Sequence, residues 1–234
     1  MGFVVLPALA ADIGPVYDAY FAAFKNNAVT RAFFPSATED DLTKSDSEFR
    51  KVHTQNTLQY WQTTPTQYTV KCVDTETDKV VGMALWDIYL TPSDWKKGEI
   101  SWLHGKEKDR ADALISPLWD VRERLWGNKR YLYCHVIAVH PDHCRRGVGE
   151  LLFRFGMSIA EQTNLPIYIE SSKEARRLYE KMGCKLLKER PIHKSEDMWP
   201  EKTNGAKEDQ DVALYVWVPS NKVDLLPQEV ELAP

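Results

Sequence analysis

A buried strand that runs through a basic loop into an amphipathic helix constrains the fold of this chain more than any other feature. Residues 131–139 end without polar alternation, which is typical of a strand with both faces buried. His140-Pro141-Asp142 ends this strand, and Gly147 begins a helix that the pattern extends to Gln162. The apolar positions of that helix recur at helical spacing, at Val148, Leu151, Leu152, Phe155 and Ile159. A strand followed at once by such a helix predicts a sheet that helices cover.

Further strands and helices surround this segment. Ser45-Asp46-Ser47-Glu48 matches the capping box that begins a helix. Ser171 and Glu174 are expected to cap a later helix, and Gly183 occupies the place of its left-handed end. We expect the other strands at about residues 3–6, 67–73, 79–89, 167–170, 185–189 and 212–218, and further helices at 12–24 and within 91–128. The pattern predicts an α/β fold with a mixed (α+β) sheet.

The length of 234 residues fits one large domain. We assign residues 1–219 to that domain and residues 220–234 to a loosely attached C-terminal tail. Residues 191–210 are expected to form a polar loop. The helix within 91–128 carries one side of mostly apolar residues, at Ala111, Leu114, Ile115, Leu118, Arg122 and Leu125.

The composition excludes several classes of function. A formal net charge of −4 leaves no basic excess to neutralise nucleic-acid phosphates. The four cysteines show neither a CxxC pair nor zinc-site spacing, so we expect reduced thiols and no metal site. No apolar run reaches transmembrane length, and the N-terminal segment is a poor match to a secretory signal. We therefore expect a cytoplasmic protein with no nucleic-acid and no membrane partner.

The loop before the helix at Gly147 has the chemistry of an anion cradle. The first turn of a helix leaves backbone N–H groups unpaired, and these groups bind anions on the helix axis. Gly147 and Gly149 allow a pyrophosphate to approach the backbone, and Arg145 and Arg146 add positive charge. A lone pair of such glycines is more typical of a tight turn. The buried strand and the basic loop favour the cradle.

This segment resembles the coenzyme A-binding core of the GNAT acyltransferase superfamily, whose loop reads Gln/Arg-x-x-Gly-x-Gly/Ala. Gly147 and Gly149 match the two small residues, whereas Cys144 stands at the Gln/Arg position. A second match comprises Ile167-Tyr168-Ile169-Glu170 and then Leu178-Tyr179-Glu180-Lys181-Met182-Gly183-Cys184, where Cys184 replaces the usual aromatic residue. The resemblance covers about residues 80–190, and residues 91–128 look like an insertion before the cofactor strand.

The resemblance implies a GNAT-like fold, with strands four and five splayed apart, helices on both faces and acetyl-CoA as the cosubstrate. The pantetheine arm would lie in the gap and pair with the backbone of the cofactor strand. A backbone N–H near Ile137 or Ala138 would stabilise the oxyanion. The residues expected to contact the cofactor are Ile137, Ala138, Val139, Cys144, Arg145, Arg146, Gly147, Val148, Gly149, Glu150, Ser171, Ala175 and Tyr179.

Three residues are candidates for the chemistry. Tyr179 matches the superfamily tyrosine that faces the coenzyme A sulfur, which implies a general acid; packing in the core is the alternative. His135 resembles a histidine of arylalkylamine N-acetyltransferases that assists amine deprotonation, and a buried structural histidine is the alternative. Alternation along the strand predicts that His135 shares a face with Ile137. Tyr133 either extends a proton relay or lines the wall.

The predicted function is acetyl transfer from acetyl-CoA to a small amine, which would be the partner of this chain. Transfer to a protein lysine or N-terminus is an alternative, as is a non-catalytic acetyl-CoA-binding module. The insertion favours a roofed pocket over an open groove, and some of the eight tryptophans could bind an aromatic or cationic acceptor. The sequence leaves the acceptor and the oligomeric state open.

Overall fold

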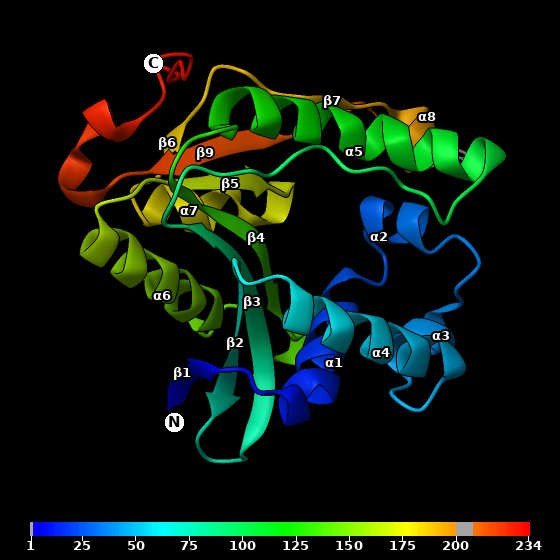
Figure 1. The fold of residues 1–234 in the computed structure, drawn as a ribbon. Coiled ribbons are helices and arrows are strands. Elements are labelled where there is room, and N and C mark those ends of the chain that lie inside the picture. The colour runs from blue at the N-terminus through cyan, green and yellow to red at the C-terminus, as the bar shows by residue number, and fades with distance from the viewer. Residues whose placement is uncertain (1, 200–207) are drawn as a thin grey trace.

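A mixed sheet runs through the middle of the molecule (Figure 1), and the computed structural model describes residues 2–199 and 208–234. Within these residues, every neighbouring pair of strands is antiparallel except β4 and β5, which are parallel. The fold prediction of a mixed α/β sheet is therefore confirmed. In spatial order the strands are β1 (Phe3–Pro7), β2 (Gln67–Asp74), β3 (Lys79–Tyr89), β4 (Tyr131–Val139), β5 (Ile167–Ser171), β9 (Ala213–Trp217) and β6 (Lys185–Leu186).

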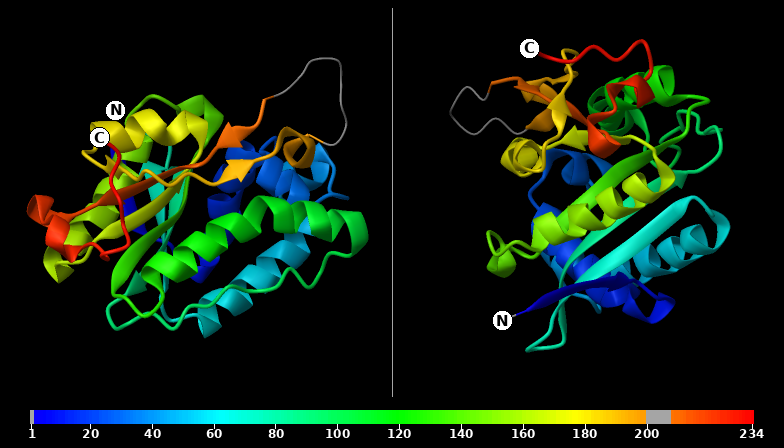
Figure 2. Two further views of the ribbon diagram at one scale, coloured as in Figure 1. Left: turned by 90° about the horizontal axis from the view of Figure 1, so that it is seen from above. Right: turned by 90° about the vertical axis from the view of Figure 1, so that its left-hand side faces the viewer.

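Helices cover both faces of this sheet (Figure 2). On one face lie α6 (Val148–Thr163) and α7 (Arg176–Lys181), and on the other lie α1 (Ile13–Phe24) and α5 (Gly105–Trp126). At Gly156 the α6 helix comes so close to the sheet that a Cβ would lie 2.2 Å from the Trp86 ring, so only glycine fits there. The remaining elements are α2 (Ala28–Phe33), α3 (Glu39–Thr43), α4 (Glu48–Thr63), α8 (Ser195–Met198), the ribbon β7 (Ile192–His193) with β8 (Gln210–Asp211), and short 3₁₀ turns at 10–12, 141–143, 173–175, 219–221 and 223–225.

The α5 helix packs through two separate apolar clusters. Its first half, with Ala111 and Leu114, packs with α2 and α8. Its second half, with Leu118 and Leu125, packs on the strands beside Tyr131. Pro117 lies between the two halves, inside the helix. All six residues expected on one side of this helix are buried.

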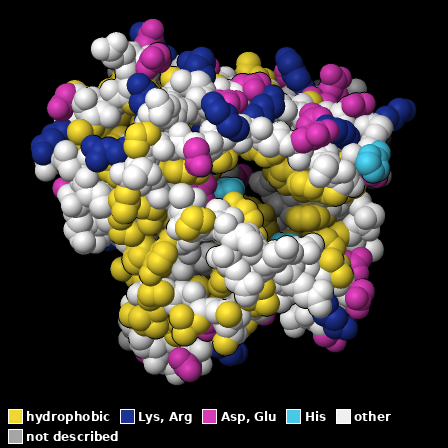
Figure 3. Space-filling model, in the orientation of Figure 1, with side chains coloured by type: hydrophobic (Ala, Val, Ile, Leu, Met, Phe, Trp, Pro, Cys, Tyr) yellow, Lys and Arg dark blue, Asp and Glu magenta, His cyan; other side chains and the backbone are white. Residues whose placement is uncertain are grey.

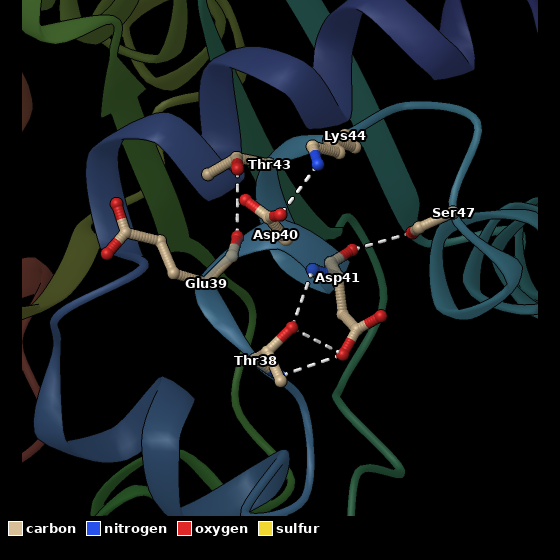
Figure 4. Close-up of polar contacts among 7 residues, drawn as sticks. All are labelled: Thr38, Glu39, Asp40, Asp41, Thr43, Lys44 and Ser47. Atoms are coloured by element: carbon tan, nitrogen blue, oxygen red, sulfur yellow. Dashed lines mark hydrogen bonds and ion pairs between the residues drawn. The ribbon is translucent and has the colours of Figure 1, made fainter.

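The caps of α3 and α4 lie next to each other, and Figure 4 shows the α3 cap and the bond of Ser47 to Asp41. Thr38 accepts the N–H of Asp41 at 3.1 Å, while the Asp41 carboxylate accepts the Thr38 N–H at 2.9 Å. Ser47 caps α4 by accepting the N–H of Arg50, and its hydroxyl also donates to the Asp41 carbonyl at 2.7 Å. The α4 helix therefore begins after Ser47, and the prediction of a capping box from Ser45 is wrong by one half-turn because Ser47 makes the cap.

The C-terminal residues correct a second prediction. Leu232 forms an antiparallel bridge with Leu187, and the Ala233 N–H donates to the Leu186 carbonyl at 2.8 Å. Leu226 and Val230 pack against the cluster around α5. The tail is not loosely attached, because its apolar side chains cover this edge of the sheet. The expected polar loop at 191–210 contains β7, α8 and the first residue of β8, and its residues 200–207 lie outside the described residues.

Candidate active site

Strands β4 and β5 part in the middle of the sheet. Their parallel pairing covers only three residue pairs, and the last of these joins Cys134 to Ile169. β4 continues to Val139, paired on its other edge with β3. Over residues 135–139 the edge of β4 that faces β5 therefore has no strand partner among the described residues. This parting is the splay expected between strands four and five.

A β-bulge in β4 lies at the start of this parting. Trp86 of β3 pairs with Cys134, and the preceding residue Leu85 pairs with Val136, so His135 is the extra residue. Paired residues of antiparallel strands point to the same face. Cys134 and Ile137 therefore both pack toward α6, whereas His135 lies on the opposite face. The prediction that His135 and Ile137 share a face is wrong, because the bulge shifts the alternation by one residue.

On the face covered by α5, a buried cation holds a buried carboxylate. Arg122 is 2% exposed and Asp87 is 4% exposed. An Arg122 Nη2 donates to Asp87 Oδ2 at 2.9 Å, and its Nε donates to the Tyr131 hydroxyl at 3.0 Å. The guanidinium also lies 3.7 Å from the Tyr133 ring centre and 4.2 Å from that of Trp95. Charge pairing, hydrogen bonds and cation–π contact together fix the position of this arginine.

His135 lies beside this ion pair. Its Nδ1 is 3.8 Å from Asp87 Oδ2, and its side chain is 41% exposed while that of Asp87 is 6% exposed. Its ring centre lies 5.2 Å from that of Tyr133. Burial alone would raise the pKa of Asp87, but His135 and Arg122 outweigh burial and lower that pKa below its ordinary value. Asp87 is therefore an ionised carboxylate next to an accessible imidazole.

Tyr133 reaches a second carboxylate, at the end of β5. Its hydroxyl donates to Glu170 Oε2 at 2.8 Å. Burial raises the pKa of Glu170, against the effect of the Tyr133 hydrogen bond. Burial also raises the pKa of Tyr133 well above 10, so the phenol keeps its proton at neutral pH. Tyr133 thus acts as a hydrogen-bond donor in this structure and not as a base.

Tyr179 lies on the other face, in the cluster beneath α6. It is 5% exposed, and its hydroxyl oxygen is 4.0 Å from the Cys134 sulfur, a weak contact. The rings of Phe153 and Tyr215 pack at 5.3 Å and 5.9 Å. Burial raises the pKa of Tyr179 well above 10, so its phenol also keeps the proton. Tyr179 therefore lies at the same level of β4 as His135, across the sheet from it.

The loop before α6 has the backbone that the sequence predicts. Gly147 caps α6 with φ of +87°, a left-handed conformation that favours glycine. At Gly149 a Cβ would point toward Leu178 and Val139, at 3.4 Å and 3.7 Å, which is ordinary contact. The requirement for glycine therefore falls on Gly147. The expectation that a Cβ at position 149 would block a ligand is not supported, since that Cβ would face the protein.

The other predicted cofactor residues differ in what they contact. Arg146 lies 3.6 Å from Asp74 and bonds to His143 at 2.7 Å, whereas no contact of the Arg145 side chain is evident within the described residues. Cys144 Sγ makes weak contacts with the His140 carbonyl at 3.7 Å and with the Val139 carbonyl at 3.9 Å. The rest of this set divides by position: Val148 is buried in the core, Glu150 pairs with Arg154 and Lys181 on the surface, Ser171 is the buried last residue of β5, and Ala175 packs partly buried before α7.

The face covered by α5 is hollowed. Figure 3 shows a depression below α5, with hydrophobic side chains around it and a histidine at its edge. The segment 90–104 and α5 run along one side of this depression, and α1, α2 and α4 lie along the others (Figure 1). Burial raises the pKa of Tyr60 of α4, and the charge of Asp87 raises it further while that of Arg122 lowers it. The hollow thus lies on the same face of the sheet as His135 and the Asp87–Arg122 pair.

Asp87, Arg122 and Glu170 were not predicted as site residues. Each carried a signal in the sequence: Asp87 is an acid within the apolar run 80–89, and Arg122 lies on the buried side of its helix. Glu170 ends an otherwise apolar strand. A charged residue in an apolar element needs a partner, but the sequence does not name that partner.

Comparisons with known proteins agree with this architecture. The model of the acetyltransferase (GNAT) family matches residues 27–184. The curated protein "probable acyltransferase SID5" of Ajellomyces capsulatus is 26% identical over 117 residues, which are 49% of this chain and 80% of that protein. Within the described residues, no helix is long and apolar enough to cross a membrane.

Solved structures share the fold over nearly the whole chain. The C-terminal condensation domain of Ebony, in complex with beta-alanyl-dopamine, superposes with a TM-score of 0.63 at 14% identity, covering 93% of this chain and 99% of that one. A mosquito arylalkylamine N-acetyltransferase-like 5b protein gives 0.56 at 17% identity, over 93% and 100%. A histone acetyltransferase HPA2-related acetyltransferase from Corynebacterium glutamicum gives 0.55 at 20% identity, over 94% and 97%.

Proposed function

Because this chain belongs to the GNAT acetyltransferase family and is an acyltransferase, we propose that it transfers the acetyl group of acetyl-CoA to the nitrogen of a small amine. One observation carries the proposal. β4 and β5 part after Cys134, and at that level His135 lies on one face of the sheet while Tyr179 lies on the other. A gap with a proton acceptor on one side and a proton donor on the other suits acyl transfer from a thiol to an amine.

The residues around the parting fit acetyl-CoA. The free edge of β4 over residues 135–139 offers backbone N–H and C=O groups to an extended pantetheine arm. The first turn of α6 after Gly147 offers unpaired N–H groups to the pyrophosphate, and Arg145 adds charge. Acetyl-CoA supplies the acetyl group as a thioester. A backbone N–H near Ile137 or Ala138 would donate to the carbonyl oxygen as negative charge develops there.

On the acceptor face, His135 takes the proton that the amine must lose. An amine is an ammonium ion near neutral pH, and an imidazole is a base suited to that range. The His135 side chain is 41% exposed, on the face of the sheet that carries the hollow, whereas Asp87 beside it is buried. Tyr133, which keeps its own proton, contributes by holding Glu170 and the wall of the hollow.

On the cofactor face, Tyr179 donates its proton to the departing thiolate. Within the described residues its hydroxyl has only the weak contact with the Cys134 sulfur, so no strong hydrogen bond there competes for the proton. The Phe153 and Tyr215 rings hold the phenol in place. Protonating a thiolate as it leaves favours its expulsion.

The hollow favours a small acceptor over a protein. The segment 90–104 and α5 form a wall above it, so an extended peptide would meet this wall (Figures 1 and 3). The fold alone does not distinguish a small-amine acceptor from a protein acceptor. Its structural neighbours include both an arylalkylamine N-acetyltransferase-like protein and a histone acetyltransferase-related one. Transfer to a protein lysine or N-terminus is therefore the second candidate.

A coenzyme A-release assay tests the proposal. The panel contains arylalkylamines, polyamines, amino sugars and a peptide pool, and we expect release with at least one small amine. Release with peptides alone would favour the protein acetyltransferase. Acetyl-CoA binding without release on any acceptor would favour a non-catalytic module. His135→Ala should lower turnover most at neutral pH, by about 10²–10⁴-fold, and recover in part at alkaline pH. A pH profile identical to that of the parent would exclude His135 as the base.

A further inference from the structure

Asp87 has one carboxylate oxygen bound and one unbound. Its Oδ2 accepts from Arg122, whereas the buried Oδ1 has no hydrogen-bond partner among the described residues. A buried acceptor without a donor is costly and calls for an explanation. His135 lies beside the same carboxylate, with its Nδ1 3.8 Å from Oδ2, the oxygen that also accepts from Arg122.

The geometry allows this donor to reach the carboxylate. A hydrogen bond needs the distance between His135 Nδ1 and Asp87 Oδ2 to shorten from 3.8 Å to about 2.9 Å. Asp87 is fixed by Arg122, but the His135 side chain is 41% exposed and is free to tilt. Hydrogen bonds at active sites are often long without ligand and shorten when substrate binds. The movement therefore belongs to His135.

We propose that Asp87 is a positioning residue that holds His135 in the tautomer with the proton on Nδ1. This proposal rests on the proposed role of His135 as the base. Neutral imidazole has one N–H and one lone-pair nitrogen, and the partner of one nitrogen decides the state of the other. A carboxylate cannot donate a proton when ionised, so it selects Nδ1–H. The lone pair is then on Nε2, the ring nitrogen that does not face Asp87.

The proton balance is simple. A nitrogen–hydrogen bond of the acceptor ammonium breaks, and a new one forms at Nε2 of His135. The imidazolium that results is stabilised by Asp87 at Nδ1, and the neutral amine keeps the electron pair with which it attacks. After transfer, His135 releases the proton to solvent through its exposed side.

The other charged or titratable groups around His135 do not supply this function. Arg122 from α5 is a permanent cation that keeps Asp87 ionised. Tyr133 from β4 donates a hydrogen bond to Glu170 of β5. The charges of Asp87 and Arg122 shift the pKa of Tyr60 of α4 in opposite directions. The charge of His135 lowers the pKa of Glu170, but the Glu170 Oε2 is engaged by Tyr133. Asp87 is thus the carboxylate placed at Nδ1.

The test reads the tautomer directly by ¹⁵N NMR of the His135 ring, assigned with His135→Gln. It needs neither acceptor nor turnover, so it is independent of the proposed function. The parent at alkaline pH should show Nδ1–H, and Asp87→Asn should show Nε2–H, since the amide can donate to Nδ1. Glu170→Gln is the matched control and should keep Nδ1–H. A parent with Nε2–H, or an Asp87→Asn protein that keeps Nδ1–H, overturns the proposal.

Asp87→Asn leaves a buried arginine unpaired, so a second variant protects the test against misfolding. The double variant Asp87→Asn/Arg122→Met removes both charges and should show the same Nε2–H tautomer. With an acceptor identified, Asp87→Asn should lower kcat by about 10²-fold or more with little change in KM for the amine, and Asp87→Glu should recover part of that loss. An unchanged kcat in Asp87→Asn would contradict the positioning role.

Discussion

The two faces of the sheet at β4 are built from opposite kinds of residue. Beneath α6, Tyr179 lies among aromatic rings and thiols, and its hydroxyl is one of few polar groups. Beneath α5, the ion pair of Arg122 and Asp87 lies beside His135 and Glu170. The apolar face can lose a functional hydroxyl without losing its packing. On the charged face the same groups contribute to both chemistry and stability, because each buried charge depends on its partner.

The largest difference between the faces should appear in stability. Arg122→Met leaves Asp87 buried without its cation, which typically costs about 3–5 kcal/mol. For a chain of this length the melting temperature should fall by about 2–4 °C for each kcal/mol. Urea denaturation gives the free energy of unfolding, and the double variant Arg122→Met/Asp87→Leu should regain most of the loss. If Arg122→Met stays within about 1 kcal/mol of the parent, the charged face does not depend on this pair.

Tyr179→Phe should show the reverse pattern on the apolar face. The ring still packs, so stability should change little, but single-turnover acetyl transfer should fall by about 10²-fold, or about 2.7 kcal/mol. Affinity for acetyl-CoA should be nearly unchanged, since the hydroxyl acts only as the thiolate leaves. Tyr215→Phe makes the same change in a neighbouring ring and should keep the parent rate. Equal rates in parent and Tyr179→Phe would make Tyr179 a packing residue.

The cofactor loop should respond at one glycine more than at the other. Gly147→Ala must adopt a left-handed backbone at about 1–2 kcal/mol, or shift the loop and weaken acetyl-CoA binding. Gly149→Ala places its Cβ in ordinary contact with Leu178 and Val139. It should change the free energy of unfolding and the free energy of acetyl-CoA binding by less than about 1 kcal/mol, the amount expected for one buried methyl group. Calorimetric titration with acetyl-CoA measures the affinity of both variants, and urea denaturation measures their free energy of unfolding. Equal effects at the two positions would show that the turn does not need the left-handed residue.

The smallest effect concerns Glu170 and pH. Burial raises the pKa of Glu170 from 4.5, so the folded protein keeps a proton that the unfolded chain loses. Parent stability should therefore fall, through this group, as pH rises from 4.5 through the raised value. Glu170→Gln removes this dependence and retains an acceptor for Tyr133. The stability of Glu170→Gln minus that of the parent should grow with pH across this window, and a difference that is constant with pH would contradict the raised pKa.

The same contrast explains what could be predicted from the sequence. The strand at 131–139, its loop and the following helix are contiguous, so local pattern predicted their bounds and the family model confirmed the resemblance. The charged face joins residues that are 35 positions apart in the Arg122–Asp87 pair and 37 apart in the Tyr133–Glu170 pair. The packing of α5 on the sheet brings the first pair together, and the parallel pairing of β4 with β5 brings the second pair together.

The bulge at His135 also could not be predicted from the sequence. Alternation assumes that a strand pairs without insertions, and the extra residue is defined only by its partner strand β3. The roles of His135, Tyr133 and Tyr179 stay predictions for the variants above to test. What the sequence did carry was the residue type: a histidine at the end of a buried run.

Pro117 divides α5 into two halves that pack against different parts of the molecule. Proline has no N–H, so one backbone hydrogen bond of the helix is missing at Pro117. The two halves can therefore tilt relative to each other more easily than in an uninterrupted helix. The half after Pro117 carries Arg122 and is tied to the sheet, while the half before it borders the hollow near α2. Substitutions before the proline should therefore change the hollow and leave the charged groups in place. Under the proposed function, the choice of acceptor and the chemistry would then depend on different residues of the same helix.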